Sequence, residues 1–175
     1  MIAGLGHDIV CVQQFAQQMR DTTGWRKLFS TRELRQCALR AEAKNDDESL
    51  HVAARWAGKE AVIKAWSEAL SVCGGEYPYT LDNTPWNEIE IIDDSRGCPS
   101  VQLSASVEER LTKSLVKFSS VCGDFACRDS VAEDSAAQDS VVRWHVSLTH
   151  DGCLADGTAI ASAVVILELL IKNFN

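Results

Sequence analysis

The chain has 175 residues, of which 46% are hydrophobic and 24% charged, so it is long enough to form one globular domain with a sizeable core. Its net charge of −8 argues against general nucleic-acid binding, which relies on a broad basic surface. The seven cysteines show no regular spacing and indicate neither a disulfide framework nor a zinc ribbon. The first residues lack the features of a secretion signal, and the longest apolar run, from Ala159 to Ile171, is interrupted by Glu168 and too short to span a bilayer. We therefore expect a cytoplasmic protein with reduced thiols that does not insert into membranes.

The first half of the chain is predicted to form one strand followed by helices. Residues 1–12 are apolar apart from His7 and Asp8, as in a buried strand. Helical segments are expected at 13–19, 25–29 and 33–42, with Thr31 as the N-cap of the third. A solvated loop at 44–49 then precedes a long helix at 51–70, which ends at Cys73-Gly74-Gly75.

The second half is predicted to supply most of an antiparallel sheet. Residues 88–92 and 100–103 alternate polar and apolar side chains, and the turn between them at 96–99 makes them a hairpin. An amphipathic helix is expected at 106–118, an inserted loop at 119–140, and strands at 141–148 and 159–169. The fold class is therefore α+β, with an antiparallel sheet packed on a long central helix in a single domain, 1–175.

The long helix carries two charged residues on a face built from small side chains. At about 100° per residue, Glu60 and Lys64 lie one turn apart beside Ala53 and Ala57. Arg55, Lys59 and Trp66 fall on the far side, where a surface helix would keep its ion pairs. One interpretation is a routine i,i+4 salt bridge worth roughly 0.2–0.5 kcal/mol. The other is a functional pair, since charges on a packed face are costly unless they are paired or bind metal.

Asp8 is a candidate partner for this pair. It lies in the apolar first strand, just after Gly4 and Gly6, which indicate a close backbone approach. A carboxylate there is either a turn or N-cap residue or part of a site; the strand alone does not distinguish the two.

Three long motifs in this order resemble one known family. They are Gly-x-Asp-Ile-Val near the start, Trp-Ala-Gly-Lys-Glu-Ala-x-x-Lys about fifty residues later, and Val-Ser-Leu-Thr-His at 146–150. Together they are similar to the holo-(acyl-carrier-protein) synthase family of 4′-phosphopantetheinyl transferases. Phe29-Ser30-Thr31-Arg32-Glu33 and Arg96-Gly97-Cys98-Pro99 resemble two further family segments, so the likeness runs from Ile2 to about Leu167.

The resemblance implies an enzyme that transfers 4′-phosphopantetheine from coenzyme A to a serine of an apo acyl carrier protein or carrier domain, releasing adenosine 3′,5′-bisphosphate. Asp8 and Glu60 match the family's Mg²⁺ ligands, and hard oxygen ligands suit an ion that holds phosphate oxygens. Lys64 matches its phosphate-contacting lysine. Two groups are candidates for taking the proton of the serine, Glu60 and a metal-bound water, with Lys64 as a possible helper of either.

The resemblance also implies which residues bind the nucleotide end of coenzyme A and how the subunits assemble. Ser147, Thr149 and His150 resemble the family's segment for the adenine and 3′-phosphate, and Gly97 and Pro99 its turn near the adenine. A homotrimer with the site between neighbouring subunits is implied, since the single unit is small. His7 is read as structural, and four tryptophans are assigned to the core or to subunit contacts: Trp56, Trp66, Trp86 and Trp144.

The sequence does not identify which carrier protein is modified. Many family members have an arginine where this chain has Gln14, so one charge for an acidic carrier is missing, and Arg20, Arg26 or Lys27 could substitute. A carrier domain of a multifunctional fatty-acid synthase is the alternative. Two other functions remain to be weighed: a non-catalytic coenzyme A-binding module, and a magnesium-dependent nucleotide hydrolase, which no Gly-rich phosphate loop supports.

Overall fold

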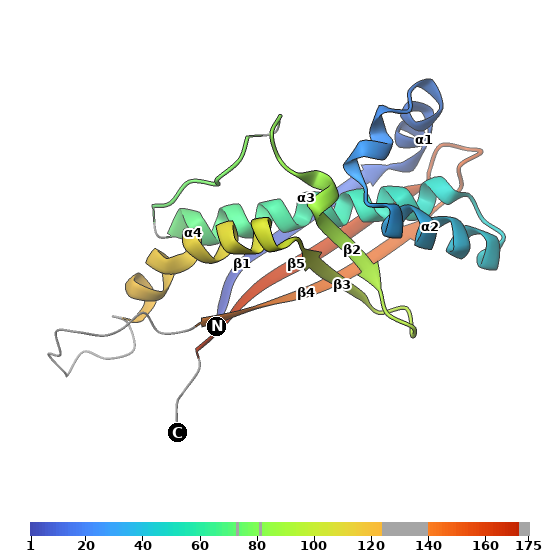
Figure 1. Ribbon diagram of the computed structural model, residues 1–175. Helices are drawn as coiled ribbons and strands as arrows, with labels where there is room; N and C mark the ends of the chain where they lie inside the picture. The colour runs from blue at the N-terminus through green and yellow to red at the C-terminus, as the bar shows by residue number, and fades with distance from the viewer. Residues whose placement is uncertain (73, 81, 124–139, 172–175) are drawn as a thin grey trace, which may run out of the picture.

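The computed structural model describes residues 1–72, 74–80, 82–123 and 140–171 and shows helices packed on antiparallel strands (Figure 1). The helices are α1 (Val12–Asp21), α2 (Thr31–Lys44), α3 (Glu48–Val72) and α4 (Ala105–Gly123), with 3₁₀ turns η1 (Gly24–Leu28) and η2 (Trp86–Glu88). The strands are β1 (Ile2–Cys11), β2 (Ile89–Asp93), β3 (Pro99–Leu103), β4 (Ser140–Asp151) and β5 (Ile160–Ile171). The predicted α+β class with antiparallel pairing is confirmed.

The strands form two sheets rather than the single sheet expected. One has the order β1-β5-β4 and the other is the β2-β3 hairpin. The register of the larger sheet sets Asp8 opposite Ala163 and His150 opposite Ala161. Asp8 and His150 therefore lie at nearly the same level, on the two outer strands.

Helix α3 lies along one face of the larger sheet (Figure 1) and is buried almost all round. Its small residues allow a very close approach to β1. A Cβ atom added to Gly6 would lie 1.9 Å from the carbonyl oxygen of Ala61, and one added to Gly4 would lie 2.0 Å from that of Ala65. These two glycines set the distance between strand and helix, and thereby the distance between Asp8 and the charged pair on α3.

The Gly6→Ala substitution is expected to destabilise the protein by about 1–3 kcal/mol or more, because its methyl group meets backbone rather than a side chain that can turn away. Urea unfolding measures the effect. Gly24→Ala is the matched control, since the nearest atom to its added Cβ is 3.9 Å away. Equal midpoints for the two variants would contradict the close packing of β1 on α3.

The far side of α3 is not the exposed, ion-paired face that the helical wheel predicted. Lys59 and Trp66 are fully buried, and Arg55 is only 4% exposed. The ammonium of Lys59 donates to Glu33 Oε2 at 2.8 Å and to the carbonyl oxygens of Trp86 and Ile89. The prediction was wrong because α2 and β2 cover this side, so the cations are paired inside the fold.

Several predicted boundaries also shift. The N-cap of α2 is Ser30, not Thr31: the Ser30 hydroxyl accepts from Glu33 N, and Glu33 Oε2 accepts from Ser30 N, which makes a capping box. The solvated loop at 44–49 is shorter than expected, because Lys44 ends α2 and Glu48 begins α3. Helix α4 runs to Gly123 and β4 begins at Ser140, so both ends of the predicted insert at 119–140 are regular structure. Residues 124–139 of that insert lie outside the described residues.

Within the described residues, no helix is long and apolar enough to cross a membrane.

Candidate functional site

Three predicted residues meet where β1 crosses α3. Lys64 Nζ lies 2.7 Å from Asp8 Oδ1 and 3.1 Å from the carbonyl oxygen of His7. Glu60, one turn earlier on α3, is near enough to Asp8 for their carboxyl groups to interact directly. Lys64 thus pairs with Asp8 across the two elements, whereas the simplest reading of the sequence had it paired with Glu60. Its side chain is 52% exposed, so its ammonium is free to move toward a ligand.

Lys64 is a single cation beside two carboxyl groups and does not neutralise both of them. The pKa of Glu60 is raised to about 7, first by burial and then by the neighbouring Asp8 carboxyl, and Lys64 only partly offsets this. Asp8 is itself 8% exposed. Its Oδ2 is buried, and none of the described residues donates a hydrogen bond to it. A bound cation would stabilise these two neighbouring acids and would give the buried Asp8 Oδ2 a partner.

The donor set fits Mg²⁺. Both candidate ligands are carboxylates, and they come from two elements held together by the glycine packing of β1 on α3. Mg²⁺ typically takes one or two protein carboxylates and completes its shell with waters and phosphate oxygens. The exposed side of Lys64 leaves the site open to such a ligand.

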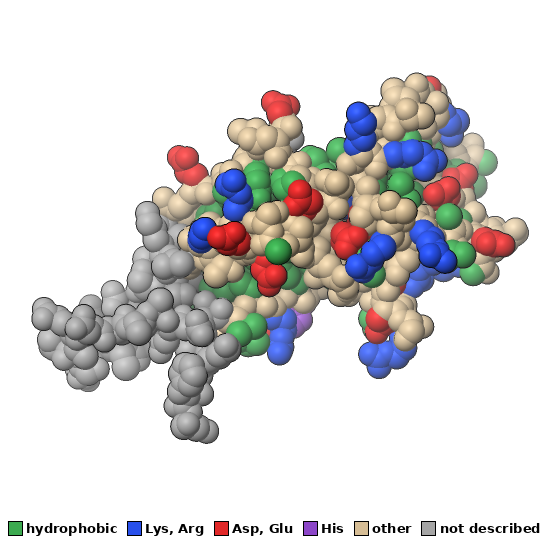
Figure 2. Space-filling model, in the orientation of Figure 1, with side chains coloured by type: hydrophobic (Ala, Val, Ile, Leu, Met, Phe, Trp, Pro, Cys, Tyr) green, Lys and Arg blue, Asp and Glu red, His purple; other side chains and the backbone are tan. Residues whose placement is uncertain are grey.

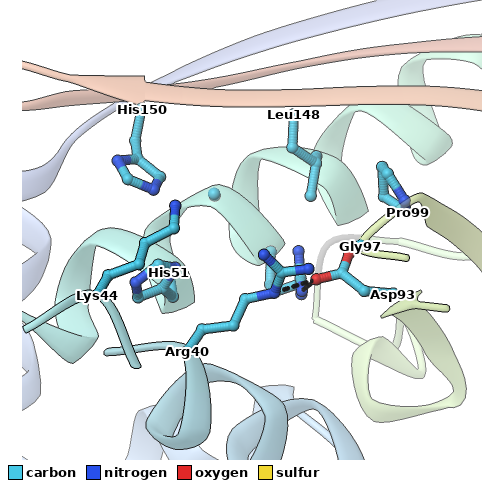
Figure 3. Close-up of a pocket in the computed structure, with 10 residues that line it drawn as sticks. Arg40, Lys44, His51, Asp93, Gly97, Pro99, Leu148 and His150 are labelled. Atoms are coloured by element: carbon cyan, nitrogen blue, oxygen red, sulfur yellow. Dashed lines mark hydrogen bonds and ion pairs between the residues drawn. The ribbon is translucent and has the colours of Figure 1, made fainter. Parts of the chain in front are cut away.

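A second group of predicted residues lines a pocket of about 120 Å³. Figure 3 shows His150 and Leu148 of β4 on one side, and Arg40 and Lys44 of α2 on the other. The remaining lining residues come from α3 and from the β2-β3 hairpin: His51, Ala54, Arg55, Asp93, Gly97 and Pro99. With five basic or imidazole side chains and one acid, the pocket is suited to an anion.

Two arginines are fixed at the floor of this pocket by one buried acid. Asp93 accepts from Arg40 Nε at 2.6 Å and from Arg55 Nη2 at 2.5 Å. The Nε of Arg55 is buried and finds no acceptor among the described residues. A phosphate oxygen is the kind of group that would satisfy it.

Gly97 and Pro99 occupy the hairpin turn beside Arg40. Gly97 has φ +85°, which favours glycine, and an added Cβ would lie 2.8 Å from Arg40 Nη2. The turn is therefore shaped to let the guanidinium approach. On the opposite wall, the pKa of His150 is lowered by burial first and then by the positive charges of His51 and Lys44.

Strand alternation separates the predicted nucleotide residues. His150 and Leu148 face the pocket, whereas Ser147 and Thr149 point to the opposite, exposed face of β4. Within one chain the structure thus brings together His150, Gly97 and Pro99 and leaves out Ser147 and Thr149. His7 also lies on that outer face, where its Nε2 is 2.9 Å from Ser162 Oγ.

The two groups lie on opposite sides of α3. At 3.6 residues per turn, His51 and Arg55 are rotated by roughly 140–180° from Glu60. Asp8, Glu60 and Lys64 are therefore separated from the pocket within one chain. We call them the carboxylate half-site and the basic pocket.

The sequence did not point to four residues of the basic pocket, Arg40, Lys44, His51 and Asp93. They come from α2, from the start of α3 and from the end of β2, which share no local motif. Arg55 was noted only for its side of the helix.

The tryptophans assigned to the core or to subunit contacts include one that is fully buried, Trp66. Trp56 and Trp86 pack against each other, with ring centroids 4.8 Å apart.

Comparison with known proteins gives the context for this geometry. The family model "4′-phosphopantetheinyl transferase superfamily" matches residues 4–128. The chain is 45% identical over 168 residues to a holo-[acyl-carrier-protein] synthase of Bifidobacterium animalis subsp. lactis, covering 95% of this chain and 97% of the relative. It is also 45% identical over 173 residues to one from Bifidobacterium adolescentis, covering 95% and 99% of the two chains.

Solved structures have a similar fold. An ACPS–CoA complex from Chronobacterium ammoniagenes aligns with a TM-score of 0.64 at 26% identity, over 97% of this chain and 98% of that one. The Helicobacter pylori holo-[acyl-carrier-protein] synthase shares the fold, with a TM-score of 0.58 at 18% identity over 94% and 99% of the two chains. The chain therefore belongs to the 4′-phosphopantetheinyl transferase superfamily, among the holo-[acyl-carrier-protein] synthases.

Proposed function

We propose that this protein transfers 4′-phosphopantetheine from coenzyme A to a serine of an apo acyl carrier protein, with Mg²⁺ held by Asp8 and Glu60. The observation that carries the metal is the Asp8–Glu60 pair with its orphaned buried oxygen. Bound there, Mg²⁺ would neutralise charge on the pyrophosphate as the phosphorus–oxygen bond breaks. Family membership and the coenzyme A complex of a relative support the substrates.

The reaction is tested by incubating the protein with coenzyme A, Mg²⁺ and an apo carrier, and weighing the carrier by mass spectrometry. A gain of one phosphopantetheine group, with release of adenosine 3′,5′-bisphosphate, is expected. Coenzyme A binding without any gain in carrier mass would favour a binding module. Cleavage of coenzyme A with an unchanged carrier would favour a hydrolase.

Lys64 is assigned to the phosphate. Its mobile ammonium now pairs with Asp8, and an ion bound to the acids would free it to follow charge on the leaving group. We expect Lys64→Ala to lower kcat by about 10²-fold while changing coenzyme A affinity much less. Steady-state kinetics and calorimetry separate the two effects. A change confined to KM would contradict the assignment.

The basic pocket is assigned to the nucleotide end of coenzyme A. It offers Lys44 and His150 to a phosphate, with Arg55 also in its lining, and Pro99 and Leu148 as apolar surface for a base. Since this pocket and the carboxylate half-site lie on opposite sides of α3, we propose that one coenzyme A spans the carboxylate half-site of one subunit and the basic pocket of the next. The homotrimer that the family resemblance implies would provide such an arrangement.

The outer face of the larger sheet supports assembly. Leu5, Ile9 and Val164 are 50%, 59% and 38% exposed there, on neighbouring strands. An apolar sheet face left open to water is typical of a contact surface. Ser147 and Thr149 project from the same face of the sheet, so they are expected at or near the subunit contact.

Mixing two variants that are each expected to lose transfer tests the shared site. Glu60→Gln lacks a carboxylate half-site and His150→Ala lacks part of the basic pocket, so co-refolded mixtures should regain activity through mixed sites. Glu60→Gln mixed with Lys64→Ala should regain none, because both changes lie in the same half-site. Light scattering that shows an active monomer, or mixtures that never recover activity, would contradict the proposal.

The carrier is proposed to dock on the end of the molecule formed by α1, η1 and α2. Gln14 is exposed there, and so are Arg20, Arg26 and Lys27. Figure 2 shows Lys and Arg side chains gathered over this end. These cations can steer an acidic carrier without an arginine at position 14. A comparison of transfer rates to a free acidic carrier and to an excised carrier domain of a multifunctional fatty-acid synthase distinguishes the two kinds of carrier.

A further inference from the structure

One cluster of metal-ligating side chains lies away from the Asp8–Glu60 pair. Asp46, His51 and His150 come from the α2–α3 connection, the start of α3 and the end of β4. Each offers one ligand atom, and these atoms lie within 4.8 Å of one another. His51 and His150 of this cluster also line the basic pocket, away from the Arg40–Asp93 pair in Figure 3.

The cluster is held in place before any ion binds. His51 is 4% exposed, and its Nε2 lies 2.7 Å from Asp46 Oδ1. The His150 ring meets the His51 ring edge to face, with centroids 5.0 Å apart and an interplanar angle of 85°. Two ligands are thus fixed by burial and by a direct contact, while the half-exposed His150 is free to adjust.

We propose that Asp46, His51 and His150 form a binding site for a divalent transition-metal ion of the Zn²⁺ class, separate from the Mg²⁺ site. Imidazole nitrogens favour zinc, cobalt and nickel, whereas Mg²⁺ prefers oxygen ligands alone. Two imidazoles and one carboxylate are a known zinc donor set that leaves a fourth position open. Because His51 and His150 line the basic pocket, water or an anionic oxygen from that pocket would complete the shell.

The geometry requires a modest adjustment. Ligands about 2.1 Å from a tetrahedral zinc ion lie roughly 3.4 Å apart, which is less than the 4.8 Å limit within which the three atoms fall. His150 must turn toward His51. Asp46 Oδ1 and His51 Nε2, now 2.7 Å apart, must separate by roughly 0.7 Å as the ion takes the place of the hydrogen bond between them.

The surrounding charges set the expected strength. Asp46 and Asp151 act on His150 with negative charge, and Lys44 acts with positive charge. Arg40 and Arg55 are already paired with Asp93. Lys44 is therefore the main cation opposing the ion, and its exposed side chain can swing away. Lys44→Met is expected to strengthen metal binding, although Lys44 itself belongs to the proposed nucleotide pocket.

Cobalt is a suitable probe because its visible absorption reports low-coordinate nitrogen and oxygen ligation. Co²⁺ titrated into the full-length protein should give one absorbing equivalent per chain. His150→Gln and His51→Gln should each weaken binding by about tenfold or more. His150 is half-exposed, so its variant should fold normally, and far-ultraviolet circular dichroism checks both variants.

The chain supplies matched controls in its other two histidines. His7 and His145 lie on the outer sheet face, bonded to Ser162 and Glu168, so His7→Gln and His145→Gln should keep the signal. Glu60→Gln should keep it as well, which separates this site from the Mg²⁺ site. A signal that survives His150→Gln, disappears in His7→Gln or His145→Gln, or shows a sulfur-to-cobalt charge-transfer band would overturn the proposal. These results are independent of carrier modification, so the transferase assignment can stand or fall separately.

Discussion

Replacing Glu60 with glutamine is expected to abolish phosphopantetheine transfer while the protein remains folded. The amide keeps the size of the side chain but removes the negative charge that, with Asp8, would hold Mg²⁺ beside the mobile Lys64. A fall of roughly 10²–10³-fold or more in kcat is expected, as when a group that stabilises developing charge is lost. Asp8→Asn should act in the same direction. Intact-mass assays of the carrier measure transfer, and calorimetry measures Mg²⁺ binding.

Glu68→Gln provides a matched control for Glu60→Gln. Glu68 lies two turns further along α3, and its Oε2 accepts from the backbone nitrogen of Leu5 on β1. An amide oxygen still accepts that bond, so transfer should be nearly unchanged. Unaltered Mg²⁺ binding in both Glu60→Gln and Asp8→Asn would show that these acids are not the ligands.

The second large effect concerns stability. Lys59→Met should destabilise the protein by about 3–5 kcal/mol, because it leaves the buried Glu33 carboxylate without its cation. Glu33 and Lys59 are both 0% exposed and lie 2.8 Å apart. Glu33 also accepts from the backbone nitrogens of Ser30 and Ile91, so the pair joins α2, α3 and β2. Urea unfolding monitored by tryptophan fluorescence measures the change.

Two further variants make this prediction specific. Glu33→Gln combined with Lys59→Met removes both charges, and it should be more stable than Lys59→Met alone. Lys113→Met breaks the exposed pair with Glu109 on α4 and should hardly move the unfolding midpoint. If Lys59→Met matched Lys113→Met, the buried pair would not be a major source of stability.

The charged residues of α3 could be placed from the sequence only in part. The wheel of α3 correctly placed Glu60 and Lys64 together on its small-residue face, and the motif around Asp8 supplied their partner. It misplaced Arg55 and Lys59, because a single wheel assumes one buried face. Helix α3 is covered by the larger sheet on one side and by α2 and β2 on the other. Its high apolar content was the available signal, since a helix that is hydrophobic all round is buried.

The nucleotide residues show a different limit. A period of two along β4 already implies that His150 faces away from Ser147 and Thr149, so their separation could have been predicted. The contributions of Arg40, Lys44 and Asp93 could not, because these residues are brought to His150 only by the packing of α2 and the hairpin against α3. Local patterns locate residues on an element. They do not specify which elements meet.

The shared site can be examined in a crystal structure of the protein with coenzyme A and with Mn²⁺ in place of Mg²⁺. We expect an anomalous manganese peak between Asp8 and Glu60, with the pyrophosphate beside Lys64. The nucleotide end should lie in the basic pocket of a neighbouring subunit, against Arg55 and His150. Manganese bound elsewhere, or a nucleotide that avoids the basic pocket of every subunit, would show that Asp8 and Glu60 do not hold the metal or that the site is not shared.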